Sequence, residues 1–456
     1  MAHQTGSVLT AFNWQPQPEA GWLVHEILGF CRERCAAVRD LEELLRRATG
    51  TRLFDWIDHL AVPAEEGMEA RLAASGFTAQ DAAGQVWSHP GAALPTVQLH
   101  DAGVRRVTIR VESVADFLAM HRVDLAAPIE GSPLARLRKA KIAAQAGVEL
   151  WAVERHGGQG WEPQDPAADE IQAVLRHQER FRRRKRNPAC AEEGFAHASD
   201  LVRSAIEDLD TDRTCDLFFA AEREYWASRN RAAGVQKARQ DALGLGWANH
   251  DHHTYRSSRE HFVRLIAVLE DLGLICRERF YAGEDAGWGA QVLEQAAAGI
   301  VVFADVDLAR DEIAEDFAHV PLTPRDRFGT VGLWCKLHGE AFLQAGMHHL
   351  ECRFDFAAAR EQLERLGVPV MKPFTDLLYL KQAFTKGEIW PVRPERITAL
   401  LDAGAIAREA AEQFRRSGAI GSHLEILQRD EGYKGFNKAG INEIISYTDP
   451  RRHGAL

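Results

Sequence analysis

The sequence lacks the segments that would place a protein in or across a membrane. Its 456 residues contain no run of about 18 apolar residues, the length that a membrane-spanning helix needs. No basic start leads into an apolar stretch and a small-residue cleavage site, the pattern of a secretory signal. The seven cysteines are scattered and odd in number, which argues against a disulfide framework. We therefore expect a cytoplasmic protein with no membrane partner.

Positive charge is also scarce. The formal net charge is −11, and a basic run at residues 177–186 has acidic residues on both sides. A nucleic-acid partner requires a basic surface, so we expect none. The hydrophobic fraction of 46% and the charged fraction of 27% are ordinary for a globular protein, and the length leaves room for two or three domains.

What the sequence does contain is a histidine-rich segment at residues 249–256. As a strand, it would place four side chains on one face: His250, His252, Thr254 and Arg256. The opposite face would carry Asp251, His253 and Tyr255. The backbones of His252 and Arg256 would stand about 13 Å apart. A small acid bound to a metal at His252 could therefore reach Arg256 with a distant carboxylate.

Two later segments could complete a metal site, which one strand cannot close alone. Residues 346–354 alternate polar and apolar side chains and include His349 on the polar face. Residues 421–429 carry Glu425 between apolar neighbours. Two histidines and one carboxylate from three strands form the facial triad of mononuclear non-haem iron enzymes, which leaves positions open for substrate and oxygen.

Other histidines compete for these positions. His348 is the immediate neighbour of His349, His253 follows His252, and His338 stands close to a carboxylate in the sequence. Each of these histidines could also be hydrogen-bonded in the core instead of binding a metal. The metal is open as well, since Mn, Zn, Co or Ni accept the same ligands as iron. A non-enzymatic binding protein with structural histidines is therefore one alternative.

The chain from residue 249 onward resembles the catalytic half of the 4-hydroxyphenylpyruvate dioxygenase family, in the vicinal-oxygen-chelate, or glyoxalase-like, superfamily. The likeness lies in three segments. Residues 251–273 and 348–368 each join a strand to a helix, and residues 424–436 join a strand to the pair Gly435-Phe436. Carried over by position, the resemblance implies that His252, His349 and Glu425 bind Fe(II). It also implies that O2 and a 2-oxo acid are the small-molecule partners, and that the reaction is an oxidative decarboxylation.

A weaker resemblance is to 2-oxoadipate dioxygenase/decarboxylase-type proteins, which share a histidine followed four positions later by an arginine, here His252 and Arg256. It implies that Arg256 holds a substrate carboxylate, with Arg353 as a second candidate. The sequence departs from this family at Pro321, where a ligand histidine would stand. We therefore take the middle ligand from His349.

Aromatic side chains are expected to line the substrate cavity of such a module: Trp334, Phe374 and Phe436. The stretch at residues 432–437, continued by residues 441–445, resembles the segment that covers the site in the dioxygenases. Fold does not determine reaction, so an extradiol dioxygenase, a lyase or an isomerase on the same scaffold is a further alternative.

The first part of the chain repeats the same pattern. Residues 54–76 again join an Asp-His strand to a helix and a glycine, so that His59 would match His252. Further on, Glu149 would match Glu425, but Arg106 stands where His349 would be. Two ligands bind a divalent ion far more weakly than three, so this module is expected to lack the metal.

We accordingly predict an α+β fold with two tandem glyoxalase-like βαβββ modules, each a cupped mixed sheet, and an added helical region. The expected parts are an N-terminal helical segment (1–50), a module without metal (51–158), a helical insertion (159–246) and a catalytic module (247–456). A homo-oligomer is compatible with this organisation.

Overall fold

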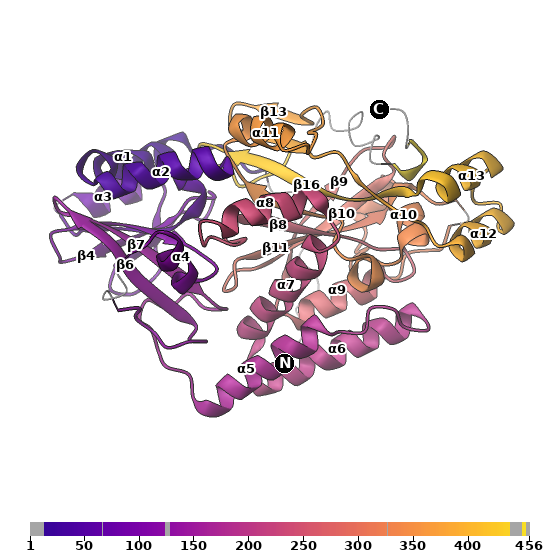
Figure 1. The fold of residues 1–456 in the computed structure, drawn as a ribbon, viewed down its shortest axis with the longest axis horizontal. Helices are drawn as coiled ribbons and strands as arrows, with labels where there is room; N and C mark the ends of the chain where they lie inside the picture. Colours follow the sequence, from indigo (N-terminus) through magenta and orange to yellow (C-terminus); the bar gives the residue numbers. More distant parts are fainter. Residues whose placement is uncertain (1–12, 66, 124–127, 326, 438–448, 453–456) are drawn as a thin grey trace.

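The computed structural model describes residues 13–65, 67–123, 128–325, 327–437 and 449–452. Within these residues the strands form two mixed sheets, one of seven strands and one of nine. Figure 1 shows the N-terminal sheet on the left, the C-terminal sheet on the right, and helices below and between them.

The C-terminal sheet consists of two βαβββ units joined side by side. The first unit comprises β8 (His250–Arg256), α9 (Phe262–Asp271), β9 (Ile275–Tyr281), β10 (Trp288–Gln295) and β11 (Ile300–Asp307). The second comprises β12 (His349–Arg353), α11 (Phe356–Arg365), β13 (Thr375–Leu377), β14 (Leu380–Phe384) and β16 (Ala419–Arg429). In each unit the first strand pairs in parallel with the last, and the two first strands, β8 and β12, pair antiparallel.

The N-terminal sheet has the same arrangement, except that its second unit has three strands instead of four. Its first unit comprises β1 (Ile57–Pro63), α3 (Met68–Ala74), β2 (Thr78–Ala79), β3 (Val86–Ser88) and β4 (Thr96–His100). Its second comprises β5 (Arg105–Arg110), α4 (Val114–Met120), β6 (Leu137–Gln145) and β7 (Val148–Arg155). Here β1 pairs in parallel with β4, β5 in parallel with β7, and β1 antiparallel with β5. The predicted α+β fold with two glyoxalase-like modules is confirmed, and each module contains a pair of units.

Strand register relates the two sheets residue by residue. His59 pairs with Thr108 across β1 and β5, and Thr108 pairs with Trp151 across β5 and β7. The corresponding path in the C-terminal sheet is His252, Glu351 and Glu425. Trp151 therefore corresponds to Glu425, and the predicted match of Glu149 to Glu425 is wrong by two residues. A two-residue slip keeps every side chain on the same face, so the polar–apolar alternation could not reveal it.

A β-bulge interrupts the first strand of both sheets at the same point. The pairing skips Asp58 in β1 and Asp251 in β8. Each aspartate is bound by an arginine at the end of the last strand of the sheet: Arg155 donates to Asp58, and Arg429 donates to Asp251. This shared irregularity supports the duplication independently of the strand order.

Two helices cover the N-terminal sheet and reach the other half of the molecule. They are α1 (Pro18–Arg34) and α2 (Ala36–Thr49), and their buried residues share one core with the sheet. α2 ends at Gly50, which has φ of 69°. A Cβ atom there would lie 2.8 Å from the Cα of Ala359 in α11, so glycine allows the close approach of the two helices.

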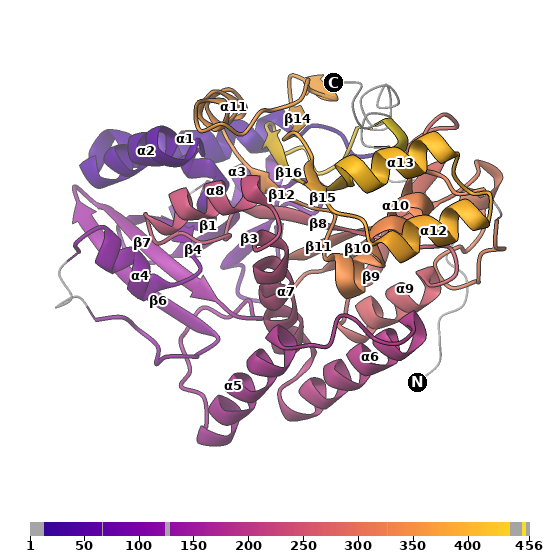
Figure 2. The same ribbon diagram turned by 45° about the vertical axis from the view of Figure 1, so that its right-hand side comes forward.

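Four helices form the region between the sheets: α5 (Ala168–Arg182), α6 (Ala191–Asp208), α7 (Thr211–Ala227) and α8 (Arg231–Asp241). Figure 2 shows α7 in the middle of the molecule, with α5 and α6 below it. The Phe219 ring contacts those of His253 and Tyr255, and the Trp226 indole donates to Ser422 Oγ over 2.8 Å. These helices therefore share the core of the C-terminal sheet, on the face opposite His252.

Two segments are inserted into the C-terminal sheet, one between β11 and β12 and one between β14 and β16. Together they form a small hydrophobic core that includes Leu333, Ile397 and Phe414. Their elements are α10 (Thr330–His338), β15 (Glu388–Trp390), α12 (Pro394–Asp402) and α13 (Arg408–Ser417). Short helical turns complete the chain: η1 (Leu53–Trp56), η2 (Asp311–Ala314), η3 (Ala341–Ala345) and η4 (Pro450–Arg452). Among the helices described, none is long and apolar enough to span a bilayer.

The packing of α7 generates a stability prediction. Leu217 is 5% exposed, whereas Leu175, on α5, is 51% exposed. We expect Leu217→Ala to lower the free energy of unfolding by about 2 to 5 kcal/mol, because it leaves a cavity in the shared core. Leu175→Ala serves as the control and should change it by about 0.5 kcal/mol or less. Urea titration followed by circular dichroism measures both, and equal effects would contradict a core that includes α7.

Candidate metal centre

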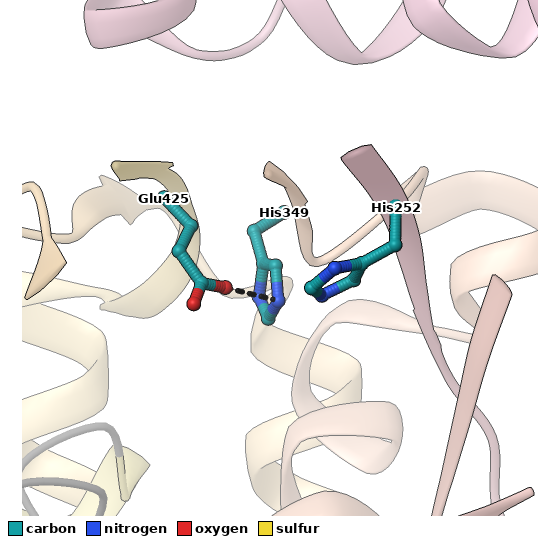
Figure 3. Close-up of side chains that lie close together, drawn as sticks. All are labelled: His252, His349 and Glu425. Atoms are coloured by element: carbon teal, nitrogen blue, oxygen red, sulfur yellow. Dashed lines mark ion pairs between the residues drawn. The ribbon is translucent and has the colours of Figure 1, made fainter. Parts of the chain in front are cut away.

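Three central strands of the C-terminal sheet bring the predicted ligands together. His252 comes from β8, His349 from β12 and Glu425 from β16, and a ligand atom of each lies within 4.8 Å of the others. Figure 3 shows the two rings and the carboxylate pointing toward one another. All three side chains are buried. Residues separated by many positions in the sequence thus form one compact group of metal-type donors.

Carboxylates lie beside both imidazole rings. His252 Nδ1 lies 3.1 Å from Glu351 Oε1 and 3.4 Å from Asp251 Oδ1, which leaves Nε2 as the nitrogen to offer to a metal. His349 Nε2 lies 3.0 Å from Glu425 Oε2. Burial disfavours charge on His252, but Glu351 and Asp251 outweigh it and raise the pKa of His252 to about 9. Burial lowers the pKa of His349 well below its ordinary value, so that ring is neutral.

Two buried carboxylates lie side by side in this centre. Burial and the neighbouring Glu351 raise the pKa of Glu425 well above its ordinary value. The amide of Gln382 donates to both carboxylates, over 3.2 Å in each case. A divalent cation held by His252, His349 and Glu425 would stabilise both charged carboxylates, so the donor set fits a metal in charge as well as in geometry.

Glu351 and Gln382 were not predicted as site residues. The alternation of residues 346–354 places Glu351 on the His349 face, so this signal was available in the sequence. Gln382 lies on a short strand whose pairing with β16 becomes evident only in the folded sheet.

Asp251 lies near the site because of the bulge in β8. The predicted two-residue alternation placed it on the face opposite His252, and that prediction is wrong, since the bulge turns it toward the His252 ring. The bulge also moves His250, which was predicted on the His252 face, to the opposite face. Its ring centroid lies 5.1 Å from that of His253. Arg429 holds Asp251 through two hydrogen bonds of 3.0 Å.

The centre opens into a cavity of about 70 Å³. Six of its thirteen lining residues are phenylalanine or tryptophan: Phe280, Trp288, Phe303, Phe374, Phe384 and Phe436. Phe374 and Phe436 are two of the three predicted pocket residues. The third, Trp334, is fully buried, donates its indole N–H to Gly421 and does not line the cavity. The segment at residues 432–437 reaches the cavity through Phe436, whereas residues 441–445 lie outside the described residues.

A polar end of the cavity lies further along β8, at Thr254 and Asp305. Arg256 is the register partner of Asp305 and is 2% exposed, and its Nε and Nη1 have no hydrogen-bond partner among the described residues. Burial raises the pKa of Asp305 to about 7, against the opposing effect of Arg256. Arg353, the second predicted arginine, donates instead to Asp251 over 3.0 Å.

The competing histidines lie outside the ligand group. His348 Nδ1 bonds with the Gly421 carbonyl, and His338 Nε2 with the Ile420 carbonyl, each over 3.0 Å. His253 faces α7, where its Nε2 accepts from Arg223. The structure therefore brings together His252, His349 and Glu425 and separates the alternatives from them.

Strand order and the buried histidine–histidine–glutamate group together define the class of protein: the chain has the vicinal-oxygen-chelate, or glyoxalase-like, fold, with a candidate metal centre in its second sheet. No protein-family model and no curated protein matches the chain.

Several solved structures are similar to it at low identity. One is a mutant of 4-hydroxymandelate synthase from Streptomyces coelicolor, with 14% identity, a TM-score of 0.30, and coverage of 75% of this chain and 96% of that one. Methylmalonyl-CoA epimerase from Mycobacterium tuberculosis has 15% identity, a TM-score of 0.23, and coverage of 40% and 87%. A xylose isomerase-like TIM barrel/4-hydroxyphenylpyruvate dioxygenase fusion protein has 12% identity, a TM-score of 0.24, and coverage of 88% and 53%. With TM-scores this low, the fold assignment rests on the strand order instead.

The contact between Glu351 and His252 generates a prediction about metal affinity. Glu351→Gln removes the charge that orients the His252 ring, and we expect the affinity for Fe(II) to fall about ten- to a hundredfold. Glu364→Gln, at an exposed position on α11, is the control and should bind as the wild type does. Anaerobic titration with a competing chelator measures the affinity. Unchanged affinity in Glu351→Gln would show that this carboxylate does not act on the centre.

Proposed function

We propose that this protein is a mononuclear Fe(II)-dependent dioxygenase that oxidatively decarboxylates a 2-oxo acid. The observation that carries the proposal is the buried convergence of His252, His349 and Glu425 beside an aromatic cavity. Two histidines and one carboxylate are the ligand set that leaves neighbouring metal positions open for a chelating substrate and O2. Bound iron would supply the redox chemistry with O2 that no side chain in the cavity can supply.

The residues around the centre would hold and orient the reactants. His252 and His349 would bind the metal as neutral rings. Asp251 would accept the Nδ1 proton of His252, and Glu351 lies within ion-pair distance of the same nitrogen, so that Nε2 stays unprotonated. The aromatic walls exclude water and contact the apolar part of the substrate.

Arg256 indicates that the substrate carries a second carboxylate. Its guanidinium is buried beyond the polar end of the cavity and has unpartnered nitrogens. A buried guanidinium with free donors pairs strongly with a carboxylate. The backbones of His252 and Arg256 stand about 13 Å apart on one strand, and their side chains span part of that distance. A molecule bound to the metal by its 2-oxocarboxylate would need a second carboxylate directed along the strand toward Arg256. A 2-oxo dicarboxylic acid meets that requirement.

Another reaction on the same scaffold remains the second candidate, because the buried triad suits several divalent metals and several reactions. An extradiol dioxygenase would consume O2 without releasing CO2, and a lyase or isomerase would need no O2. A non-enzymatic binding protein would take up no stoichiometric metal. Coupled measurement of O2 uptake and CO2 release from 2-oxo acids separates these alternatives.

The triad is tested by metal content. We expect anaerobically purified wild-type protein to hold about one iron per chain, and His252→Ala, His349→Ala and Glu425→Ala each to lose it, because two ligands bind far more weakly than three. Elemental mass spectrometry measures the metal, and circular dichroism establishes that each variant is folded. His197→Ala, at an exposed position on α6, is the control and should retain iron. A folded wild-type protein that takes up no metal when iron is supplied would overturn the proposal.

The role of Arg256 is tested by substrate selectivity. We expect Arg256→Met to raise KM about ten- to a hundredfold for a 2-oxo dicarboxylic acid, through loss of one charge-assisted pair, and to leave KM for a 2-oxo monocarboxylic acid nearly unchanged. Arg353→Met is the matched control, because Arg353 is bound to Asp251. Steady-state O2 uptake gives both constants. An equal change of KM for the two acids would rule out a carboxylate contact at Arg256.

A further inference from the structure

The N-terminal sheet contains a second cavity at the place that corresponds to the candidate metal centre. Its volume is about 90 Å³, compared with about 70 Å³ for the cavity at the metal centre. His59, Arg106 and Trp151 line it. By register these residues occupy the positions of His252, His349 and Glu425. The duplicated fold has thus kept a cavity at this place and changed the groups that face it.

The changed groups suit an anion instead of a metal cation. Among the described residues, no group of three metal-type donors occurs at this cavity. Arg106 adds a fixed positive charge where His349 would offer a lone pair, and Trp151 has no acceptor where Glu425 would offer a carboxylate. The Nδ1 atom of His59 is engaged by Asp58 over 2.8 Å. Arg106 is paired with Glu149, and Glu162 also lines the cavity, so the preference rests on the available groups: the cavity lacks the lone-pair donors that a cation needs and offers N–H donors that an anion can use.

The cavity holds hydrogen-bond donors that the protein leaves unused. Arg106 donates from Nε to Glu149 over 2.9 Å, and its Nη1 and Nη2 have no acceptor among the described residues. Thr108 is 3% exposed, and neither its hydroxyl nor the Gln98 amide has a hydrogen-bond partner in the described part of the chain. Both side chains line the cavity, so their polar atoms are accessible to a ligand or to water there. These groups could surround an anion with several donors.

Two other features narrow the chemistry of the ligand. Trp151 and Trp161 line the cavity, so part of the ligand is apolar. The paired nitrogens of a guanidinium match the two oxygens of a carboxylate. We propose that the N-terminal sheet binds a small organic carboxylate, with its carboxylate on Arg106 and its apolar part against Trp151 and Trp161. This second site needs no metal and is separate from the proposed function of the C-terminal cavity.

The proposal is tested by fluorine NMR on the full chain labelled with 5-fluorotryptophan. Trp151→Phe and Trp161→Phe assign the two reporter signals, and Trp288 reports on the metal-centre cavity. Propionate is the probe, propionamide the neutral match, and inorganic phosphate the competing anion, all at constant ionic strength. We expect propionate to shift the Trp151 and Trp161 signals with saturation, and propionamide and phosphate to cause no saturable shift.

Variants distinguish the site from non-specific binding and from the metal centre. Arg106 is 35% exposed through its side chain, so Arg106→Gln should stay folded, and we expect it to weaken propionate binding about tenfold or more. Arg106→Lys keeps the charge and should bind with intermediate affinity. His252→Ala should leave the Trp151 and Trp161 shifts unchanged, whatever becomes of the iron. Linear shifts, equal shifts with propionamide or phosphate, or full binding by Arg106→Gln would each overturn the proposal.

Discussion

The geometry of the candidate metal centre depends on one buried ion pair, between Asp251 and Arg429. Asp251 is the extra residue of the bulge in β8, and Arg429 ends β16. Arg429 also donates to the carbonyl oxygens of Tyr433 and Gly435. One guanidinium therefore joins the strand that carries His252, the strand that carries Glu425 and the segment that brings Phe436 to the cavity. Breaking such a pair would leave an uncompensated buried charge, which is strongly destabilising.

The same ion pair in the N-terminal sheet shows what the duplicated architecture preserves. Asp58 and Arg155 repeat the bulge and its arginine, so the backbone beside the two cavities is built in the same way. The side chains that face the two cavities have nevertheless diverged in charge. At two of the three corresponding positions, His349 and Glu425 face the C-terminal cavity, whereas Arg106 and Trp151 face the N-terminal one. A common backbone thus presents a group of metal-type donors in one sheet and N–H donors in the other, because function resides in the side chains placed on a fold.

Charge balance is a second constraint on the candidate metal centre. Glu351 and Glu425 are buried beside each other, and in a low dielectric two adjacent carboxylates cannot both remain charged without a nearby cation. Without a metal, a charged His252 ring supplies part of that positive charge, and the Gln382 amide donates to both carboxylates; a metal on Nε2 would replace the second His252 proton. A divalent ion would complete the balance. The aromatic cavity on one face of the sheet and α7 on the other exclude water from these carboxylates. In the resulting low dielectric, an unbalanced charge costs more than it would in water.

The sequence by itself determined the fold class and the ligand candidates, because both depend on local patterns. Alternation along residues 249–256, 346–354 and 421–429 predicted three strands, and the resemblance of residues 251–436 to a known family selected His252, His349 and Glu425.

Only the tertiary structure decided the register and the bulges. Polar–apolar alternation repeats every two residues, so matching Glu149 instead of Trp151 to Glu425 leaves the pattern unchanged. The extra residue at Asp251 is likewise not visible in the local sequence. Trp334 was placed in the cavity for a related reason: an aromatic residue in the core and one in a cavity wall look the same in a sequence, and only packing distinguishes them.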